Sequence, residues 1–254
     1  LGDFLLAFDE EKPSATTHRH WQIAEVVEAS RAQLPCYRLI FDDGTKIVAS
    51  SDHRWLAGGN DRRSWKWLTT EQLVCNRKQR RSHVLRLTPR VDEENTREAG
   101  WVAGFYDGEG CVTLSPTERV MVAQNPGLEI GRVAKWLEER NFSFATYRRE
   151  PKGRYKSPNL TLTVRGGMRE TLRFLMLTRP DRLIRKLAQI IPQVSLRSRR
   201  MAVGLMDKEY LGLQEVVTLG TTTGTFVAEG LASHNSMAGI LLQAGNLRVM
   251  GREA

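Results

Sequence analysis

Near the C-terminus, three consecutive residues have side chains that could together cleave the peptide bond after the second of them: His234, Asn235 and Ser236. An asparagine side-chain amide can attack its own backbone carbonyl, which forms a succinimide and breaks the bond to the next residue. The attack needs a polarised carbonyl and a protonated leaving amine, and a neighbouring imidazole can supply both because it titrates near neutral pH. The Ser236 hydroxyl could then accept an acyl group. Taken alone, the tripeptide also fits an ordinary surface loop.

Two carboxylates stand in a glycine-rich stretch in the middle of the chain, Asp107 and Glu109 within the sequence DGEG. Carboxylates, phosphate oxygens and water are the usual ligands of Mg²⁺, and paired metals suit the in-line cleavage of phosphodiester bonds. The same four residues are also typical of a loop that follows a core helix. The residues around them decide between the two interpretations.

The stretch TFVAEGLASHNS, residues 225–236, closely resembles the C-terminal splice region of inteins. In that family a penultimate His and a terminal Asn precede the Ser, Thr or Cys that opens the downstream host protein. The stretch GTKIVASSDHRWL, residues 44–56, is similar to the family motif in which a Thr or Ser stands three residues before a His. Here those residues are Ser50 and His53. As a lone residue, His53 would fit a structural surface histidine.

Two further stretches support the resemblance, LGDFLLAF at residues 1–8 and WLTTEQL at residues 67–73, and all four stand in the family's order. The resemblance implies a β-rich Hint-type splicing domain that needs no cofactor and has the flanking host segments as partners in cis. It also implies that His53 activates the upstream scissile bond. At the downstream bond, Asn235 would cyclise with the help of His234.

The chain departs from the family pattern at two places. A Cys, Ser or Ala usually stands a couple of places before the Gly-Asp pair, whereas this sequence begins at Leu1. We therefore expect the chain as it stands to be limited to cyclisation of Asn235, which cuts the downstream bond without ligation. The family also has an Asp that helps the upstream steps. The candidates for its position are Val216, Val217 and Thr218, with Glu215 as a stand-in.

The stretch WVAGFYDGEG, residues 101–110, resembles the LAGLIDADG motif of homing endonucleases, a helix that ends in a tight acidic turn. The resemblance implies that Ala103 and Gly104 let two such helices pack closely. It implies that Glu109 is the catalytic acid and binds Mg²⁺, with Asp107 as a second metal candidate that more often has a structural role. One motif supplies one acid, and cutting both DNA strands needs two, so we expect a homodimer and a pseudo-palindromic site.

The DNA target that this resemblance implies is the host gene without its insert, which would receive a double-strand break. The alternative is a catalytically dead domain that only binds DNA. The charge distribution fits either, because residues 95–200 contain 20 Lys and Arg against 10 Asp and Glu, and the rest contains 18 against 19. Such a bias favours nucleic acid, although a solvated basic surface would also account for it. The expected base or phosphate contacts are Thr113, Arg119, Arg148, Arg149, Arg154 and Lys156.

The elements around these motifs predict a β-rich domain that is split in sequence by an inserted α+β domain. Residues 92–200 predict the order αββαββα with one more helix, and residues 1–90 and 201–235 predict short strands and turns. An Asp-Gly pair within residues 38–48 predicts a hairpin, and residues 65–75 predict a turn and a short helix. The expected domains are 1–90 and 201–235 for splicing, 92–200 for the endonuclease, and 236–254 for the start of the C-extein.

Composition excludes several other classes of protein. No apolar run approaches the roughly 20 residues that span a bilayer, and the N-terminus has no secretory signal pattern. The three cysteines, Cys36, Cys75 and Cys111, lack the spacing of a disulfide framework or a zinc site. We therefore expect a cytoplasmic protein with no membrane partner.

Overall fold

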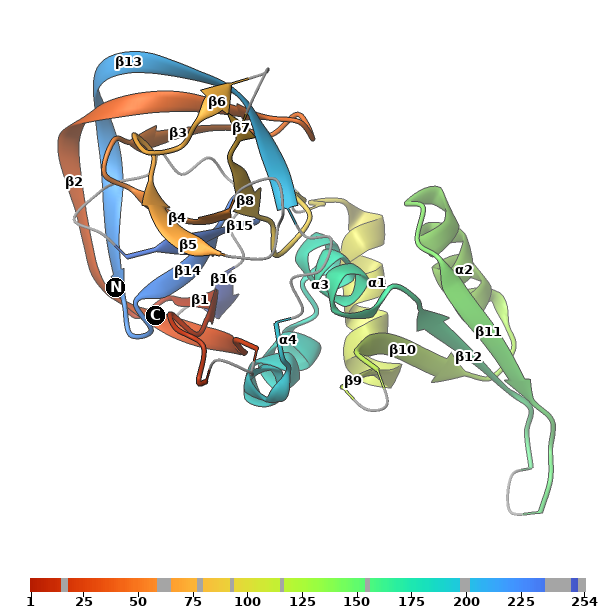
Figure 1. Cartoon of the computed structure of the whole chain (residues 1–254). Helices are drawn as coiled ribbons and strands as arrows, with labels where there is room; N and C mark the ends of the chain where they lie inside the picture. Colours follow the sequence, from red (N-terminus) through yellow and green to blue (C-terminus); the bar gives the residue numbers. More distant parts are fainter. Residues whose placement is uncertain are drawn as a thin grey trace. The chain divides into compact units, whose positions relative to one another are not determined.

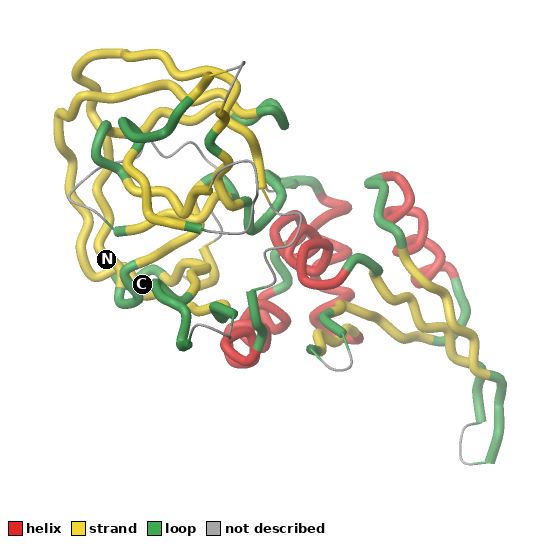
Figure 2. The backbone as a smooth tube through the Cα atoms, viewed as in Figure 1, coloured by secondary structure: helices red, strands yellow, loops and turns green. Residues whose placement is uncertain are grey.

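The computed structural model describes residues 1–14, 18–58, 65–76, 80–91, 94–114, 117–153, 156–196, 202–235 and 248–250. The chain forms two compact units, a strand-rich unit of Leu1–Arg90 with Ile191–Ala254 and a mixed unit of Val91–Ile190. Helices gather in the mixed unit and long strands in the other (Figure 2). The second division falls at Ile190 rather than at residue 200, because Val194 and Leu196 pair their backbone with residues of the strand-rich unit.

The strand-rich unit is a ten-stranded antiparallel sheet that is nearly closed, in the order β14-β15-β4-β8-β13-β2-β1-β16, with β3 added to β2 and β5 added to β4. The strands β2 and β13 pair along most of their length and arch over the unit (Figure 1). The short strands β6 and β7 form a separate ribbon. The elements are β1 (Phe4–Phe8), β2 (Trp21–Phe41), β3 (Lys46–Ser50), β4 (Arg54–Gly58), β5 (Lys66–Thr69), β6 (Cys75–Asn76), β7 (Arg80–Arg81), β8 (His83–Leu85), η1 (Ile191–Gln193), β13 (Ala202–Thr221), β14 (Thr225–Ala228), β15 (Leu231–His234) and β16 (Arg248–Met250).

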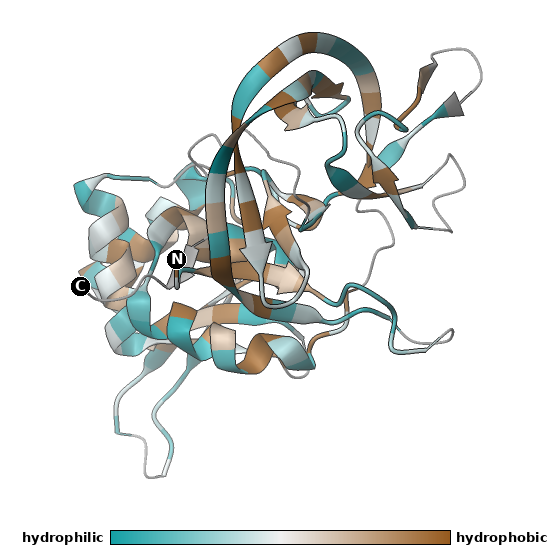
Figure 3. Cartoon of the chain, turned by 90° about the vertical axis from the view of Figure 1, so that its left-hand side faces the viewer, coloured by the Kyte–Doolittle hydropathy of each residue, from teal (hydrophilic) through white to brown (hydrophobic). Residues whose placement is uncertain are grey.

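Side chains from almost every strand fill the interior of this unit. The buried cluster includes Leu39, Phe41, Trp55, Leu205 and Phe226, each at most 4% exposed. Hydrophobic and hydrophilic residues alternate along the long arched strands (Figure 3), as expected for strands with one face toward a core. Burial of apolar surface is the main source of folding free energy. Because this core contains side chains from several strands, it stabilises the packing of those strands against one another.

Of two local predictions for the strand-rich unit, one is confirmed and one is wrong. The Asp-Gly hairpin is confirmed, because β2 turns into β3 at Gly44, whose φ of +83° suits a residue without a Cβ. The short helix within residues 65–75 is wrong, since Lys66–Thr69 forms a strand that pairs with β4. After that strand the side chains and backbones of Thr69 and Gln72 exchange hydrogen bonds, which close one turn and no more.

The mixed unit has the element order that the sequence predicts. Its four-stranded antiparallel sheet has the order β11-β12-β10-β9, and α1, α3 and α4 pack against it. Alternate residues of the strands, such as Val112, Val120 and Leu162, are buried on the helix side. The elements are α1 (Arg97–Glu109), β9 (Gly110–Thr113), β10 (Arg119–Gln124), α2 (Leu128–Glu139), β11 (Phe144–Arg149), β12 (Asn159–Val164), α3 (Gly167–Thr178) and α4 (Asp181–Ile190).

Helix α1 begins at Arg97, directly after a capping threonine. The Thr96 side chain caps it by accepting a hydrogen bond from the backbone N–H of Ala99 at 3.1 Å. One face of the helix buries Ala99, Val102 and Tyr106. The opposite face contains three glycines at helical spacing, Gly100, Gly104 and Gly108, and a Cβ added to any of them would meet nothing within 4 Å. None of the helices in the described part of the chain is long and apolar enough to cross a membrane.

Candidate functional site

The hairpin of β14 and β15 leads directly to the candidate splice junction. His234 ends β15 and lies opposite Thr225 of β14. The turn between the strands has two residues with positive φ, Glu229 at +49° and Gly230 at +79°. Such turns match the right-handed twist of paired strands. A Cβ on Gly230 would lie 2.5 Å from the Thr88 carbonyl oxygen, so a glycine is required there.

The buried side chain of Arg86 forms polar contacts that connect this hairpin to the rest of the sheet. The Arg86 guanidinium donates to the Glu229 carbonyl oxygen at 3.3 Å and to the Thr45 hydroxyl at 2.6 Å. It also forms an ion pair with Asp43 at 2.7 Å. These contacts join the turn between β14 and β15 to the turn between β2 and β3.

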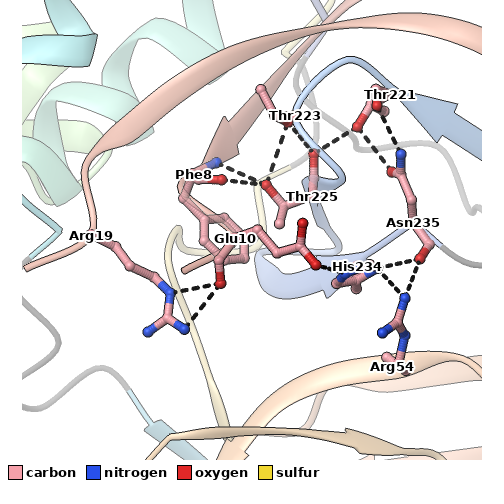
Figure 4. Close-up of polar contacts among 9 residues, drawn as sticks. All are labelled: Phe8, Glu10, Arg19, Arg54, Thr221, Thr223, Thr225, His234 and Asn235. Carbon is pink, nitrogen blue, oxygen red and sulfur yellow. Dashed lines mark hydrogen bonds and ion pairs between the residues drawn. The ribbon is translucent and has the colours of Figure 1, made fainter. Parts of the chain in front are cut away.

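The His234 imidazole is 6% exposed and has a different partner at each ring nitrogen (Figure 4). Nε2 lies 2.5 Å from Glu10 Oε1. Nδ1 contacts the backbone carbonyl oxygen of Asn235 and lies 2.8 Å from Arg54 Nη2. The Trp67 ring packs edge-on at 4.8 Å between centroids. Because a carboxylate only accepts hydrogen bonds, Nε2 has a proton, and Nδ1 is the nitrogen that faces the Asn235 carbonyl.

The Asn235 carbonyl has a second polar neighbour, since Arg54 Nη2 also donates to its oxygen at 3.2 Å. The Asn235 side chain points away from this pair, toward Thr221 (Figure 4). Asn235 Nδ2 donates to the Thr221 carbonyl oxygen and the Thr221 hydroxyl contacts Asn235 Oδ1, both at 2.9 Å. The single Thr221 proton is shared with the Thr225 carbonyl oxygen, also at 2.9 Å. The amide must therefore rotate before its nitrogen can reach its own carbonyl carbon.

The turn after β1 fixes Glu10 independently of His234. Arg19 donates two hydrogen bonds to the Glu10 carbonyl oxygen, at 3.2 and 3.1 Å. The carboxylate of Asp9 accepts from the His20 backbone N–H and from the Gln22 side chain, each at 2.7 Å. These contacts hold the backbone at Glu10 in position, and none of them uses the Glu10 carboxylate.

Ser50 and His53, the other predicted splicing residues, lie together in the tight turn between β3 and β4. The His53 backbone N–H donates to the Ser50 carbonyl oxygen at 3.1 Å, and both residues are at most 1% exposed. The His53 ring packs edge-on against Trp55 at 4.4 Å. His53 is therefore a buried residue, and its neighbour Arg54 contacts the junction.

Three residues of the junction were not predicted from the sequence: Glu10, Arg54 and Thr221. Arg54 stands next to the His53 motif, but no sequence pattern predicts its contact with His234, which lies 180 positions away. Thr221 is the β13 residue that contacts Asn235, whereas the expected stand-in Glu215 forms an exposed ion pair with Arg31 at 3.2 Å. Ser236, the predicted acyl acceptor, lies outside the described residues.

In the mixed unit, Asp107 and Glu109 differ in their surroundings. The Asp107 carboxylate accepts hydrogen bonds from the backbone N–H groups that open α4, at 2.8 Å from Asp181 and 2.9 Å from Arg182. Arg182 in return donates to the carbonyl oxygens that end α1, including that of Gly110 at 2.8 Å. This reciprocal capping gives Asp107 a structural role and engages both of its oxygens, which counts against the prediction that it binds metal.

Glu109 is exposed at the end of α1, and Gly110 after it has no room for a side chain, since a Cβ would lie 2.5 Å from the Tyr106 carbonyl oxygen. The described residues contain no group of three or more His, Cys, Asp or Glu that could hold a metal. Of the two predicted metal ligands, Glu109 is therefore the exposed one, and it stands directly before Gly110.

The six predicted DNA contacts do not share one surface. Thr113 and Arg119 are cross-strand neighbours on the sheet face away from the helices, and Arg149 of β11 lies on the same face. Arg148 lies on the opposite face of β11 and pairs with Glu150 at 2.7 Å, and its contact with DNA stays a prediction. Lys156 is exposed in the chain before β12, and Arg154 lies outside the described residues.

Comparison with protein-family models matches none of them, and comparison with curated proteins finds none that is significantly similar. The functional argument therefore depends on the motifs and on the geometry of the two sites.

Proposed function

We propose that the strand-rich unit is an intein-type self-processing domain that cuts the chain after Asn235. The observation that carries the proposal is the environment of one oxygen atom. The Asn235 carbonyl oxygen contacts His234 Nδ1 and accepts a hydrogen bond from Arg54 Nη2 at 3.2 Å. Arg54 is one donor to the carbonyl that must be attacked, and His234 Nδ1 becomes a second donor when the ring is protonated. Cyclisation of an asparagine needs such donors because the oxygen gains negative charge in the transition state.

The proposed reaction balances without any added group. Asn235 Nδ2 turns away from Thr221 and attacks its own carbonyl carbon, so that the new C–N bond closes a succinimide ring. Arg54 stabilises the negative charge on the oxygen, and a protonated His234 donates to the same atom. The bond to the Ser236 nitrogen then breaks, and the proton lost by Nδ2 goes to that departing amine. In this proposal His234 relays that proton, because the protonated ring gives its own proton to the departing amine and takes up the one lost by Nδ2.

The test is incubation of the purified chain with analysis of its fragments by mass spectrometry. We expect release of the 19 residues that follow Asn235. The variants Asn235→Ala and His234→Ala should stay intact or cleave far more slowly, while Gln214→Ala, on the same unit, should behave as wild type. A chain that never breaks after Asn235, in conditions where it is folded, would count against the proposal.

For the mixed unit we propose a Mg²⁺-dependent endonuclease of the LAGLIDADG type that acts as a homodimer. Three observations support it: the exposed Glu109 on a turn braced by Arg182, the open glycine face of α1, and the basic residues on the open face of the sheet. When bound, the metal would supply charge neutralisation at the scissile phosphate, with Glu109 as its ligand from each chain.

The nuclease is tested on DNA made by removing the insert's coding region, from the upstream splice residue through Asn235, from the gene that encodes this chain. We expect Mg²⁺-dependent double-strand cleavage near the insertion point, lost in Glu109→Gln with DNA binding retained in a mobility-shift assay. Binding by the wild-type protein without cleavage would favour the DNA-binding-only alternative. Neither binding nor cleavage would exclude both interpretations.

A further inference from the structure

We propose that Glu10 is the positioning residue of His234, and that it holds the imidazole so that Nδ1 faces the Asn235 carbonyl. This inference depends on the proposed cleavage after Asn235 for its functional meaning, but the Glu10–His234 contact is a separate structural claim. Glu10 lies 224 positions before His234 in the sequence, and their side-chain atoms approach to 2.5 Å.

The first step of the argument concerns the proton on the ring. An imidazole has two nitrogens, and only the arrangement with a proton on Nε2 leaves Nδ1 free to exchange a proton with the scissile bond. The Glu10 carboxylate accepts and never donates while it is charged, so it keeps a proton on Nε2. Arg54, which lies 2.8 Å from Nδ1, can donate to that nitrogen only in the same arrangement.

The second step concerns charge. When the ring takes up a second proton, at Nδ1, to assist the reaction, it becomes a cation beside the Arg54 guanidinium. Glu10 is the charged group on the other side of the ring, and it offsets the repulsion between the two cations. The remaining neighbour described here, Trp67, packs edge-on and contributes no charge. The cation on one side and the carboxylate on the other together hold the ring in one orientation.

The third step concerns rigidity. The Glu10 backbone is anchored by Arg19, and its Oε2 lies close above Gly224, where a Cβ would approach it to 2.9 Å. The close approach explains why the turn before β14 has a glycine in contact with the carboxylate. The Glu10 side chain is still 46% exposed, so water screens the pair, and we expect a moderate effect on rate, about tenfold, rather than the larger loss that follows removal of the imidazole itself.

The experiment compares Glu10→Ala and Glu10→Gln with the control Glu11→Ala, which removes the same charge from the next residue, an exposed one. The rate of cleavage after Asn235 should fall about tenfold in Glu10→Ala, less in Glu10→Gln, and stay unchanged in the control. Thermal unfolding of each variant separates loss of position from loss of fold. A Glu10→Ala protein that is folded and cleaves at the control rate would overturn the inference.

A second readout does not depend on cleavage. In the uncleavable background Asn235→Ala, with ¹⁵N-labelled histidine, the Nε2–H proton of His234 should give a resonance protected from exchange with water, assigned by its loss in His234→Gln. The same resonance should disappear into exchange with water in Glu10→Ala and persist in Glu11→Ala. If it persists without Glu10, the positioning role is refuted. If it disappears while the wild-type chain never cleaves, the contact stands and the proposed splicing function fails.

Discussion

Replacing Arg54 with alanine should slow cleavage after Asn235 by about 100-fold, which corresponds to about 2.7 kcal/mol in the transition state. Loss of one donor from an oxyanion site costs about 10² to 10³ in rate. We expect the lower end of this range because Arg54 Nη2 lies 3.2 Å from the Asn235 oxygen, and His234 contacts the same atom. Arg54→Lys keeps the charge but loses the planar fork, so its rate should be intermediate.

The assay is the rate of fragment release at fixed pH, followed by mass spectrometry of quenched samples. The matched control is Arg31→Ala, which removes an arginine from an exposed ion pair with Glu215 on the same unit. Exposed pairs contribute about 0–1 kcal/mol to stability, so the control should fold and cleave normally. The reasoning would be refuted if folded Arg54→Ala protein cleaved within about twofold of wild type, a difference of about 0.4 kcal/mol in the barrier.

Three further predictions concern other parts of the chain. Thr221→Val removes one hydrogen bond that holds the amide in its resting direction, so cleavage should become about 3- to 10-fold faster, and a slower rate would contradict the resting role. Asp107→Ala should lower the unfolding free energy of the mixed unit by about 1–2 kcal/mol in denaturant titration, whereas an unchanged value would argue against the cap. The hydrogen bond from Arg140 lowers the pKa of Glu94 from its ordinary value of 4.5, so the stability that this pair contributes is present above that pH and lost as pH falls below it. Urea unfolding of Glu94→Gln against wild type should therefore show a gap at neutral pH that closes in acid, and a gap that is constant with pH would refute this.

Local features of the sequence predicted much of the fold. The Asp-Gly turn at Gly44, the capped start of α1 at Thr96 and the alternation of apolar residues along β10 each depend on residues close together in the chain. Such short-range signals report the geometry of the backbone directly. The end of the proposed splicing unit at His234 and Asn235 comes instead from the resemblance to inteins, and it stays a prediction.

The rest depends on contacts that no spacing in the sequence encodes. The single 21-residue strand β2 appears where short strands and turns were expected, because β13 pairs with it along most of its length. The helix predicted within residues 65–75 does not form, because Lys66–Thr69 pairs with β4 as a strand. Glu10 and Arg54 reach His234 only because β1 packs beside β14 and the start of β4 lies beside β15, a consequence of tertiary packing that overrides local preference.

The most direct test of the proposed cleavage is the mass of the larger fragment. Cyclisation of Asn235 leaves a succinimide at the new C-terminus, so the fragment should be lighter by one water than the product of simple hydrolysis at the same bond. The smaller fragment should begin with an unmodified Ser236, and Asn235→Ala should give neither. A fragment with the mass of the hydrolysis product from the start, or one that also forms in Asn235→Ala, would contradict the account.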